Sequence, residues 1–301
     1  MHNLKYGATM YMPATRQDLV LVGNGEKYPE LRTLIFCTED SVSDYDVPLA
    51  IKNIQELLPR LEDTDIFRFI RPRNPHILKT ILDLPDIHKI TGFVLPKISK
   101  EILSEYLDLL LYYPNFEIMP ILETNLAFDL MRLYEFRDYI LKDKRASQIK
   151  TLRIGAMDLL NILSLRRGIS QNIYETPIGY LIDQLINVFK PAGLSLAAPG
   201  FEALAARDVL TTELSLDICR GLYAKTAIHP SQISIINHAY QVDPLDLDMA
   251  HAIQDPQNPQ VFRFQDRMCE KAVHANWAEV IVERARLFGV KCFATIPQLA
   301  R

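Results

Sequence analysis

The sequence has few of the features that mark secreted, membrane-bound or nucleic-acid-binding proteins. Its four cysteines are widely spaced and form no CxxC pair, which argues against a disulfide framework and a zinc cluster. No apolar run approaches the ~20 residues that span a membrane, and the first residues lack the apolar core of a signal peptide. Lysine and arginine form no block, and the formal net charge is −4. We therefore expect a cytoplasmic protein that binds neither a membrane nor a nucleic acid.

Glycine-rich phosphate loops, internal repeats and low-complexity tracts are also absent from the sequence. Gly23 and Gly25 form an isolated turn and no dinucleotide fingerprint. The hydrophobic content is 49%, which is enough for a full core in a chain of 301 residues. A globular enzyme or binding protein is the class that remains.

Short apolar runs alternate with amphipathic segments along most of the chain. The runs that we expect to be strands are Ala8–Met12, Thr33–Cys37, Ile66–Ile70, Gly92–Leu95, Glu117–Leu122, Thr151–Ile154, Leu194–Ala197 and Tyr223–Ile228. Expected helices include Val47–Leu61, Ile77–Leu84, Lys100–Tyr112 and Leu126–Tyr139. Eight strand–helix units predict an α/β protein, a (β/α)8 TIM barrel.

A C-terminal helical extension follows the barrel in this interpretation. We expect residues 1–242 to form the TIM-barrel catalytic domain and residues 243–301 to form the extension. A loop with two prolines begins at Asp255, and a helix is expected from about Arg267 to Phe288. Its apolar positions recur every three or four residues, which predicts a stripe that is buried against a neighbouring subunit or against the same barrel.

Two of the predicted strands end on a carboxylate. Glu123 follows the buried run Glu117–Leu122, and Asp158 follows Thr151–Ile154 after a single glycine turn. TIM-barrel enzymes place their chemistry at the carboxyl ends of parallel strands. Two acids on neighbouring strand ends could therefore share one divalent metal ion, although a lone strand-end glutamate is more often a helix cap or a surface acid.

Further charged residues follow other predicted strands, so one end of the barrel gathers both cations and carboxylates. They are Arg16 after the first strand, Glu39 and Asp40 after the second, Arg71 and Arg73 after the third, and Lys97 after the fourth. Each has a structural alternative. The two acids are also suited to cap the next helix, and an arginine at a strand end can simply form a structural ion pair.

Seven short motifs in a fixed order give a more specific signal. They are Met10–Arg16, Glu39–Val42, Arg71–Asn74, Leu95–Lys97, Ile121–Thr124, Gly155–Leu159 and Lys225–Ile233. In this order, each at a predicted strand end, they resemble the citrate lyase β-subunit and HpcH/HpaI aldolase family, and in particular a divergent TIM-barrel C–C bond lyase branch. The resemblance covers residues from about 8 to 240.

The resemblance implies a metal-dependent carbon–carbon lyase that cleaves a small oxo- or hydroxy-acid, or its acyl thioester, by a retro-aldol or Claisen-type reaction. It implies that Glu123 and Asp158 bind Mg²⁺, with Mn²⁺ as an alternative, and contact the substrate through it. It gives Arg71 the role of holding the enolate or carboxylate, with Arg73 as the alternative. Arg16, Glu39, Asp40 and Lys97 complete the expected catalytic and substrate-binding set.

The sequence also departs from the pattern of that family. The family commonly has Asp-Leu before the Glu-Asp-Ser-Val motif; here Cys37 and Thr38 replace these two residues, so one acidic contact is missing. Ala14 stands in a first-strand loop that usually contains glycine and helps to take a coenzyme A chain, so use of a coenzyme A thioester stays open. Glu270 lies where many members have an aspartate that completes a neighbouring site, so we expect a homo-oligomer, a trimer or a hexamer. Two alternatives remain: a metal-dependent thioester hydrolase on the same barrel, and a non-catalytic barrel subunit.

Overall fold

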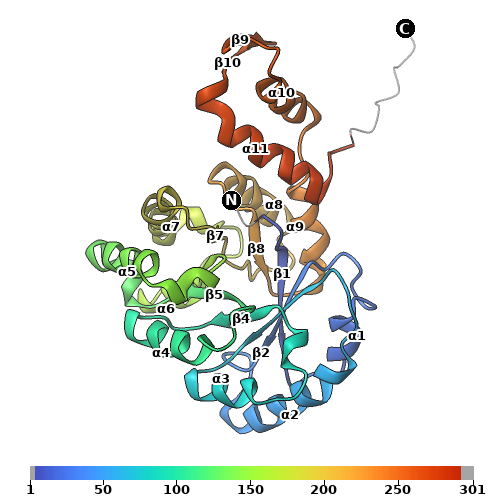
Figure 1. The fold of residues 1–301 in the computed structure, drawn as a ribbon, viewed down its shortest axis with the longest axis vertical. Helices are drawn as coiled ribbons and strands as arrows, with labels where there is room; N and C mark the ends of the chain where they lie inside the picture. The colour runs from blue at the N-terminus through green and yellow to red at the C-terminus, as the bar shows by residue number, and fades with distance from the viewer. Residues whose placement is uncertain (1–3, 293–301) are drawn as a thin grey trace. The chain divides into compact units, whose positions relative to one another are not determined.

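The first compact unit of the protein is a barrel of parallel strands. The computed structural model describes residues 4–292, and these divide into two compact units between Ile236 and Asn237. The strands of the first unit are β1 (Gly7–Pro13), β2 (Thr33–Cys37), β3 (Phe67–Arg71), β4 (Gly92–Leu95), β5 (Glu117–Leu122), β6 (Leu152–Ile154), β7 (Leu196–Ala197) and β8 (Ala224–Ala227). All eight predicted strands are therefore confirmed, with ends that shift by one or two residues (Figure 1).

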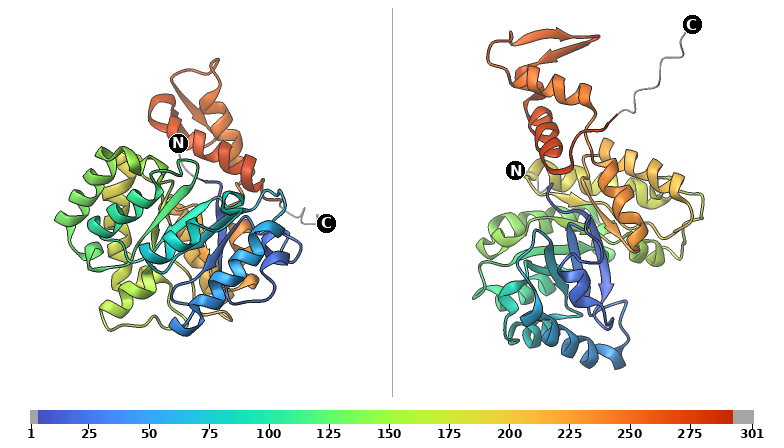
Figure 2. Two further views of the ribbon diagram at one scale, coloured as in Figure 1. Left: turned by 60° about the horizontal axis from the view of Figure 1, so that its bottom comes forward. Right: turned by 90° about the vertical axis from the view of Figure 1, so that its right-hand side faces the viewer.

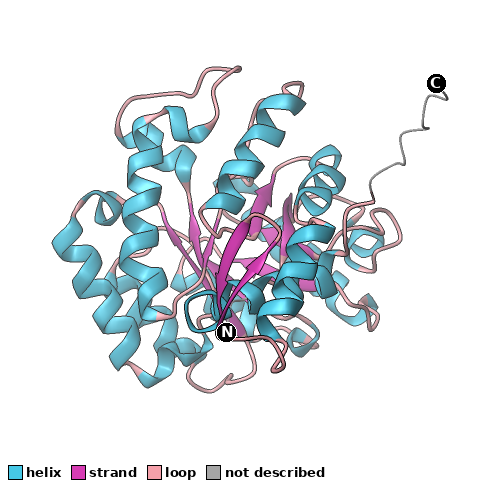
Figure 3. Cartoon of the chain, turned by 90° about the horizontal axis from the view of Figure 1, so that it is seen from above, coloured by secondary structure: helices cyan, strands magenta, loops and turns pink. Residues whose placement is uncertain are grey.

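The strands are hydrogen-bonded in the order β7-β6-β5-β4-β3-β2-β1-β8, and every neighbouring pair is parallel. The ring is completed at Ala198, just after β7. Its amide donates to Ala224 O at 2.7 Å, and its carbonyl accepts from the Thr226 amide at 3.2 Å. Seen from above, the strands lie in the centre with helices around them (Figure 3). The predicted (β/α)8 TIM barrel is confirmed.

Helices lie outside the strands of this unit, as the views in Figure 2 show. They are α1 (Leu19–Gly23), α2 (Val47–Leu57), α3 (Pro75–Leu82), α4 (Lys100–Leu110), α5 (Leu130–Lys142), α6 (Ala156–Ile162), α7 (Pro177–Phe189), α8 (Arg207–Cys219) and α9 (Ile233–Ala239). The prediction that a helix begins at Leu126 was wrong. A 3-10 turn spans Asn125–Phe128, and Asp129 then caps α5 by accepting from two backbone amides. No helix within residues 4–292 is long and apolar enough to cross a membrane.

The barrel interior is filled with apolar side chains toward the amino ends of the strands, its lower end, and is polar toward their carboxyl ends, its upper end. Because side chains alternate along a strand, every second residue points inward. The apolar interior cluster consists of Tyr6, Ile35, Phe69, Val94, Met119, Ile121, Ala197 and Ala224. Two residues after Phe69, Ile121 and Ala224, the next inward positions are polar: Arg71, Glu123 and Thr226. The alternation thus places a polar layer above an apolar plug.

The second unit contains two helices and a hairpin. It comprises α10 (Pro244–Gln254), β9 (Val261–Phe264), β10 (Arg267–Glu270) and α11 (Lys271–Phe288), and the strands β9 and β10 are antiparallel. The predicted helix from Arg267 was therefore wrong in its first four residues, which pair with β9 instead. Apolar side chains of α11, including Ile281 and Trp277, pack with Met249 and Ile253 of α10. Much of the predicted stripe is thus covered within its own unit, whereas Val273 is 68% exposed.

A buried cluster of charges ties β8 to the loops that border the barrel mouth. Lys225 of β8 is fully buried, and its ammonium contacts Glu213 at 2.7 Å and Asp217 at 2.8 Å, both from α8 and both fully buried. Arg167 contacts the same Glu213 at 2.5 Å and donates to Gly200 O at 3.0 Å. The cluster therefore fixes the loop around Gly200, which forms part of the barrel mouth.

Replacing the central cation of this cluster is expected to be costly. Lys225→Met leaves two buried carboxylates short of a partner, so we expect the free energy of unfolding to fall by ~3–5 kcal/mol. Urea denaturation measures this change. The control is Lys52→Met, since Lys52 pairs with Glu56 at the surface and should change stability by less than about 0.5 kcal/mol. Equal effects of the two substitutions would show that the cluster contributes no more than a surface pair.

Candidate active site

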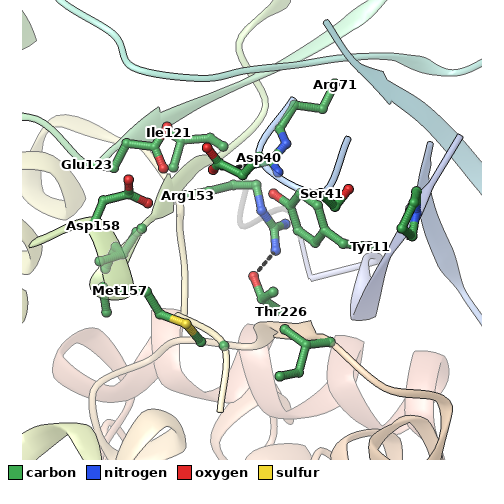
Figure 4. A pocket seen from close by; sticks show the side chains of 16 residues that line it. Tyr11, Asp40, Ser41, Arg71, Ile121, Glu123, Arg153, Met157, Asp158 and Thr226 are labelled. Atoms are coloured by element: carbon green, nitrogen blue, oxygen red, sulfur yellow. Dashed lines mark hydrogen bonds and ion pairs between the residues drawn. The ribbon is translucent and has the colours of Figure 1, made fainter. Parts of the chain in front are cut away.

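A cavity opens at the carboxyl ends of the barrel strands. Its volume is about 410 Å³. The residues that line it are Tyr11, Pro13, Asp40, Ser41, Arg71, Ile121, Glu123, Arg153, Ile154, Gly155, Ala156, Met157, Asp158, Gly200, Thr226 and Ile228. Figure 4 shows Glu123 and Asp158 on one side of the cavity and Arg153 reaching toward Thr226. Four of the residues predicted from strand ends, Asp40, Arg71, Glu123 and Asp158, therefore share one cavity wall.

Glu123 is held in place by two unusual backbone positions. The side chain is buried, and its Oε1 accepts from the Lys97 amide at 2.7 Å. Lys97 has a φ of +51°, a conformation that costs energy for a residue with a side chain and is often found at functional sites. A Cβ atom on Gly155 would lie 2.5 Å from both Cβ and Oε2 of Glu123. Gly155 is thus required for the close approach of β6 to this carboxyl group.

Lys97 links the two carboxylates that were predicted to bind a metal. Its ammonium forms an ion pair with Asp158 and lies 3.6 Å from Asp40. Burial raises the pKa of Glu123 to about 8, and the negative charge of Asp158 adds to this effect. Burial opposes the charge of Lys97, but its hydrogen bond to Asp158 and the nearby Glu123 raise its pKa overall. Glu123 therefore holds a proton near neutral pH, and the Lys97 ammonium neutralises Asp158.

Arg71 lies at the end of β3 in a nearly buried ion-pair network. Its guanidinium contacts Glu39 at 3.1 Å and Asp40 at 3.5 Å. Burial raises the pKa of Glu39 even though the arginine is adjacent. The Cys37 thiol sits against Nε and Nη2 of Arg71 at 3.2 and 3.0 Å. The sequence did not suggest that any cysteine would contact the site.

Two of the predicted substrate-binding arginines lie outside the cavity wall. Arg16 is exposed and pairs with Asp18 through both Nε and Nη2 at 2.8 Å. Arg73 contacts Asp44 at 2.6 Å and donates to the carbonyl of Val42. Both arginines thus bind neighbouring loop residues in this structure, and their roles in substrate binding stay predictions.

Three cavity residues were not identified from the sequence: Tyr11, Arg153 and Thr226. Each lies inside a strand, whereas the predicted site residues were expected to lie at or after strand ends. Arg153 is 1% exposed, and its Nη2 donates to Thr226 Oγ1 at 2.6 Å. A charged residue in the middle of the short apolar run Leu152–Ile154 is unusual for a buried strand. That signal could have identified Arg153.

The donor set of the cavity fits a hard divalent cation. Glu123 and Asp158 supply carboxylate oxygens, and the Lys97 ammonium already places a positive charge beside them. Within residues 4–292, no group of three or more His, Cys, Asp and Glu side chains is arranged to hold a metal. Two carboxylates suit Mg²⁺, which usually keeps several waters and takes few protein ligands.

A parallel eight-stranded barrel with a polar cavity at its carboxyl end defines a TIM-barrel enzyme. Residues 1–290 match the family described as C–C bond lyase of the TIM-barrel fold. The chain therefore belongs to this family and is a carbon–carbon lyase. No curated protein matches the sequence significantly.

Several solved structures share the fold. A citrate lyase from Burkholderia xenovorans LB400 superposes with a TM-score of 0.74 at 15% identity, covering 96% of this chain and 94% of that chain. The CitE protein from Mycobacterium tuberculosis, in complex with magnesium, acetoacetate and coenzyme A, gives a TM-score of 0.68 at 18% identity, with 93% and 98% covered. Malate synthase from Haloferax volcanii gives 0.66 at 11% identity, with 95% and 90% covered. At these low sequence identities, the superpositions show similarity of fold alone.

The raised pKa of Glu123 predicts a pH-dependent effect of its removal. The folded pKa of about 8 exceeds the usual value of 4.5. The free energy of unfolding therefore has its full value, with respect to Glu123, below about pH 4.5, and it falls as the pH rises toward 8. In a chelating buffer, Glu123→Gln should unfold at a higher temperature than wild type near pH 8, and the gap should narrow toward pH 5. The exposed Glu135→Gln serves as the control. A difference in unfolding temperature that does not change with pH would contradict the conclusion that Glu123 is buried in its protonated form.

Proposed function

We propose that this protein is a Mg²⁺-dependent lyase that cleaves a carbon–carbon bond in a small oxo- or hydroxy-acid or in its acyl thioester. The observation that carries the proposal is the pair of carboxylates, Glu123 and Asp158, which line one cavity with the Arg71 guanidinium. Glu123 directly follows β5, and Asp158 lies in the first turn of α6, the helix that follows β6. An acidic pair beside a fixed cation is suited to a reaction in which an enolate forms.

Glu123 and Asp158 are the residues that would hold the metal ion. Bound there, Mg²⁺ would act as a Lewis acid on the oxygen of an oxo- or hydroxy-acid. The magnesium named for the CitE complex from M. tuberculosis supports this assignment. Mn²⁺ has the same preference for oxygen ligands and is the alternative ion.

The cationic side chains of the site have separate roles in this proposal. Arg71 keeps its guanidinium plane fixed through Glu39, Asp40 and Cys37, so it can present its remaining N–H groups to a carboxylate or a developing enolate. Lys97 orients Glu123 through its backbone amide and balances the charge of Asp158 through its ammonium. Its ammonium contacts Asp158 and Asp40, which line the cavity, and could exchange a proton with a substrate bound there.

Product analysis tests the reaction against its two alternatives. The purified protein is incubated with Mg²⁺ and a panel of hydroxy-acids and their coenzyme A thioesters, and the products are identified by mass spectrometry. A lyase releases two carbon fragments, one of them an oxo compound. A thioester hydrolase releases free coenzyme A and an acid with an intact carbon skeleton. No product from any compound in the presence of Mg²⁺ would favour a non-catalytic barrel subunit.

Metal binding is predicted to depend on the acid pair. Mn²⁺ binding, measured by electron paramagnetic resonance, should be tight in the wild type and should be lost in Asp158→Asn, because the neutral amide is a poor ligand for a hard cation. Asp138→Asn is the matched control, since Asp138 pairs with Arg137 outside the cavity. Equal Mn²⁺ affinity in wild type and Asp158→Asn would remove the basis of the metal assignment.

Arg71 is predicted to act mainly in the transition state. Arg71→Lys keeps the charge and loses the planar fork, so we expect kcat to fall about a hundredfold with a smaller change in KM. The assay uses the compound that product analysis shows to be cleaved. Arg132→Lys, a change at an exposed helix position, is the control. Full activity of Arg71→Lys would transfer the role to another cation, such as Lys97.

The remaining predictions concern the oligomeric state, the domain boundary, the cellular compartment and the use of coenzyme A. We propose a homo-oligomer, a trimer or hexamer, in which Glu270 of the second unit completes a neighbouring site, and mass measurement by light scattering tests it. The domain boundary near residue 242 is likewise proposed, beside the division at Ile236. Four free cysteines support a reducing compartment such as the cytoplasm. Binding of a coenzyme A thioester is supported by the CitE complex that contains coenzyme A.

A further inference from the structure

Arg153 is a buried cation whose charge is not balanced by any acidic side chain among the described residues. It belongs to β6, is 1% exposed and lines the cavity. Its guanidinium has one oxygen partner, Thr226 Oγ1, and a distant sulfur contact to Met119 at 3.9 Å. Its Nε is buried without a hydrogen-bond partner. A guanidinium stays protonated at all relevant pH values, so it cannot escape this situation by losing its proton.

The other buried arginines of the barrel unit show what a purely structural role requires. Arg167 has two acidic partners, Glu213 and Glu202. Arg68 has three oxygen acceptors, which are the carbonyls of Gly23 and Glu62 and the hydroxyl of Thr64. Arg71 has Glu39 and Asp40. Arg153 alone among these four faces a cavity while lacking both kinds of compensation.

The surroundings of Arg153 are those of an anion-binding subsite. The ring of Tyr11 lies between two guanidiniums, with Arg71 at 4.9 Å and Arg153 at 5.6 Å from its centre. The Thr226 hydroxyl accepts from Arg153, which leaves its own proton free to be donated to a ligand. A buried cation beside a hydroxyl donor is suited to a carboxylate, which takes parallel hydrogen bonds from a guanidinium.

We propose that Arg153, with Thr226 and Tyr11, binds a second carboxylate of the substrate, so that the acid cleaved here is a dicarboxylate. The inference rests on the proposed function in one respect: Glu123, Asp158 and Arg71 take the oxo- or hydroxy-acid end. Arg153 then neutralises the other end. An acid with a methyl group in place of the second carboxylate leaves the guanidinium buried without an anion, so it binds less well.

Two four-carbon ligands isolate this contact. L-malate and L-2-hydroxybutyrate share the 2-hydroxy-acid end and differ only in a terminal carboxylate or methyl group. Isothermal titration calorimetry measures both affinities, once with Mg²⁺ and once in a chelating buffer. In the wild type we expect malate to bind at least about tenfold more tightly, which is the usual effect of one hydrogen bond to a charged group. Arg153→Met should reduce this ratio to about one by weakening malate alone.

Variants separate recognition from folding. Arg153→Lys keeps the charge without the fork and should give an intermediate ratio. Arg207→Met, at an exposed position of α8, should leave the ratio unchanged. Arg153→Met removes an uncompensated buried charge, so its unfolding temperature should be equal to or above that of wild type, whereas loss of a structural ion pair would lower it. If that variant does not fold, Thr226→Val reports instead, with a reduced preference for malate.

The outcomes distinguish this proposal from the metal-dependent reaction. A preference for malate that depends on Arg153 in the chelating buffer supports the subsite even if no carbon–carbon cleavage is found. A wild-type ratio near one, a ratio that Arg153→Met leaves unchanged, or no binding of either acid in both buffers overturns the dicarboxylate assignment. In those cases the lyase proposal is still judged separately by product analysis and by Mn²⁺ binding.

Discussion

The removal of charged side chains from water is the constraint on which this site depends. Inside the barrel a charge is stable only if an opposite charge or several dipoles replace the lost hydration. Three groups satisfy this condition: Arg71 with Glu39 and Asp40, Lys97 with Asp158, and Lys225 with Glu213 and Asp217. The first two groups join segments that are 31 and 61 residues apart in the sequence, and the third joins α8 to the strand β8 that follows it. The same contacts therefore hold the barrel mouth in shape and set the charge of the cavity.

Two side chains of this cavity, Glu123 and Arg153, are buried in arrangements that lower the stability of the fold. Glu123 is buried deeply enough that its carboxyl group holds a proton near neutral pH, and Lys97 adopts a left-handed backbone conformation to donate to it. Arg153 is buried without an acidic partner within residues 4–292. Such unfavourable arrangements persist because the rest of the fold enforces them, and they are typical of places where a ligand supplies the missing partner.

The separation of an apolar end from a polar end inside the barrel follows from the alternation of inward and outward side chains along its strands. At the lower end, inward positions carry Phe69, Val94 and Met119, which pack into an apolar plug. Toward the carboxyl ends, inward positions carry Arg71, Glu123 and Arg153. Since all the strands run parallel, these ends meet at one face of the ring. The cavity thus lies where backbone direction alone gathers the carboxyl ends of the barrel strands.

The sequence by itself determined the strands, the barrel and the two carboxylates, Glu123 and Asp158, that the structure brings to one cavity, because these depend on local pattern. Apolar runs followed by a charged residue indicated both where β5 and β6 end and which carboxylates follow them. It did not reveal the hairpin at Val261–Glu270, where pairing between strands outweighs a helical pattern. Only the tertiary structure decided that Arg16 and Arg73 turn to neighbouring acids, that Cys37 contacts Arg71, and that Arg153 meets Thr226 of β8. Those contacts join residues remote in sequence, and their partners follow from the closure of the ring, which no local pattern encodes.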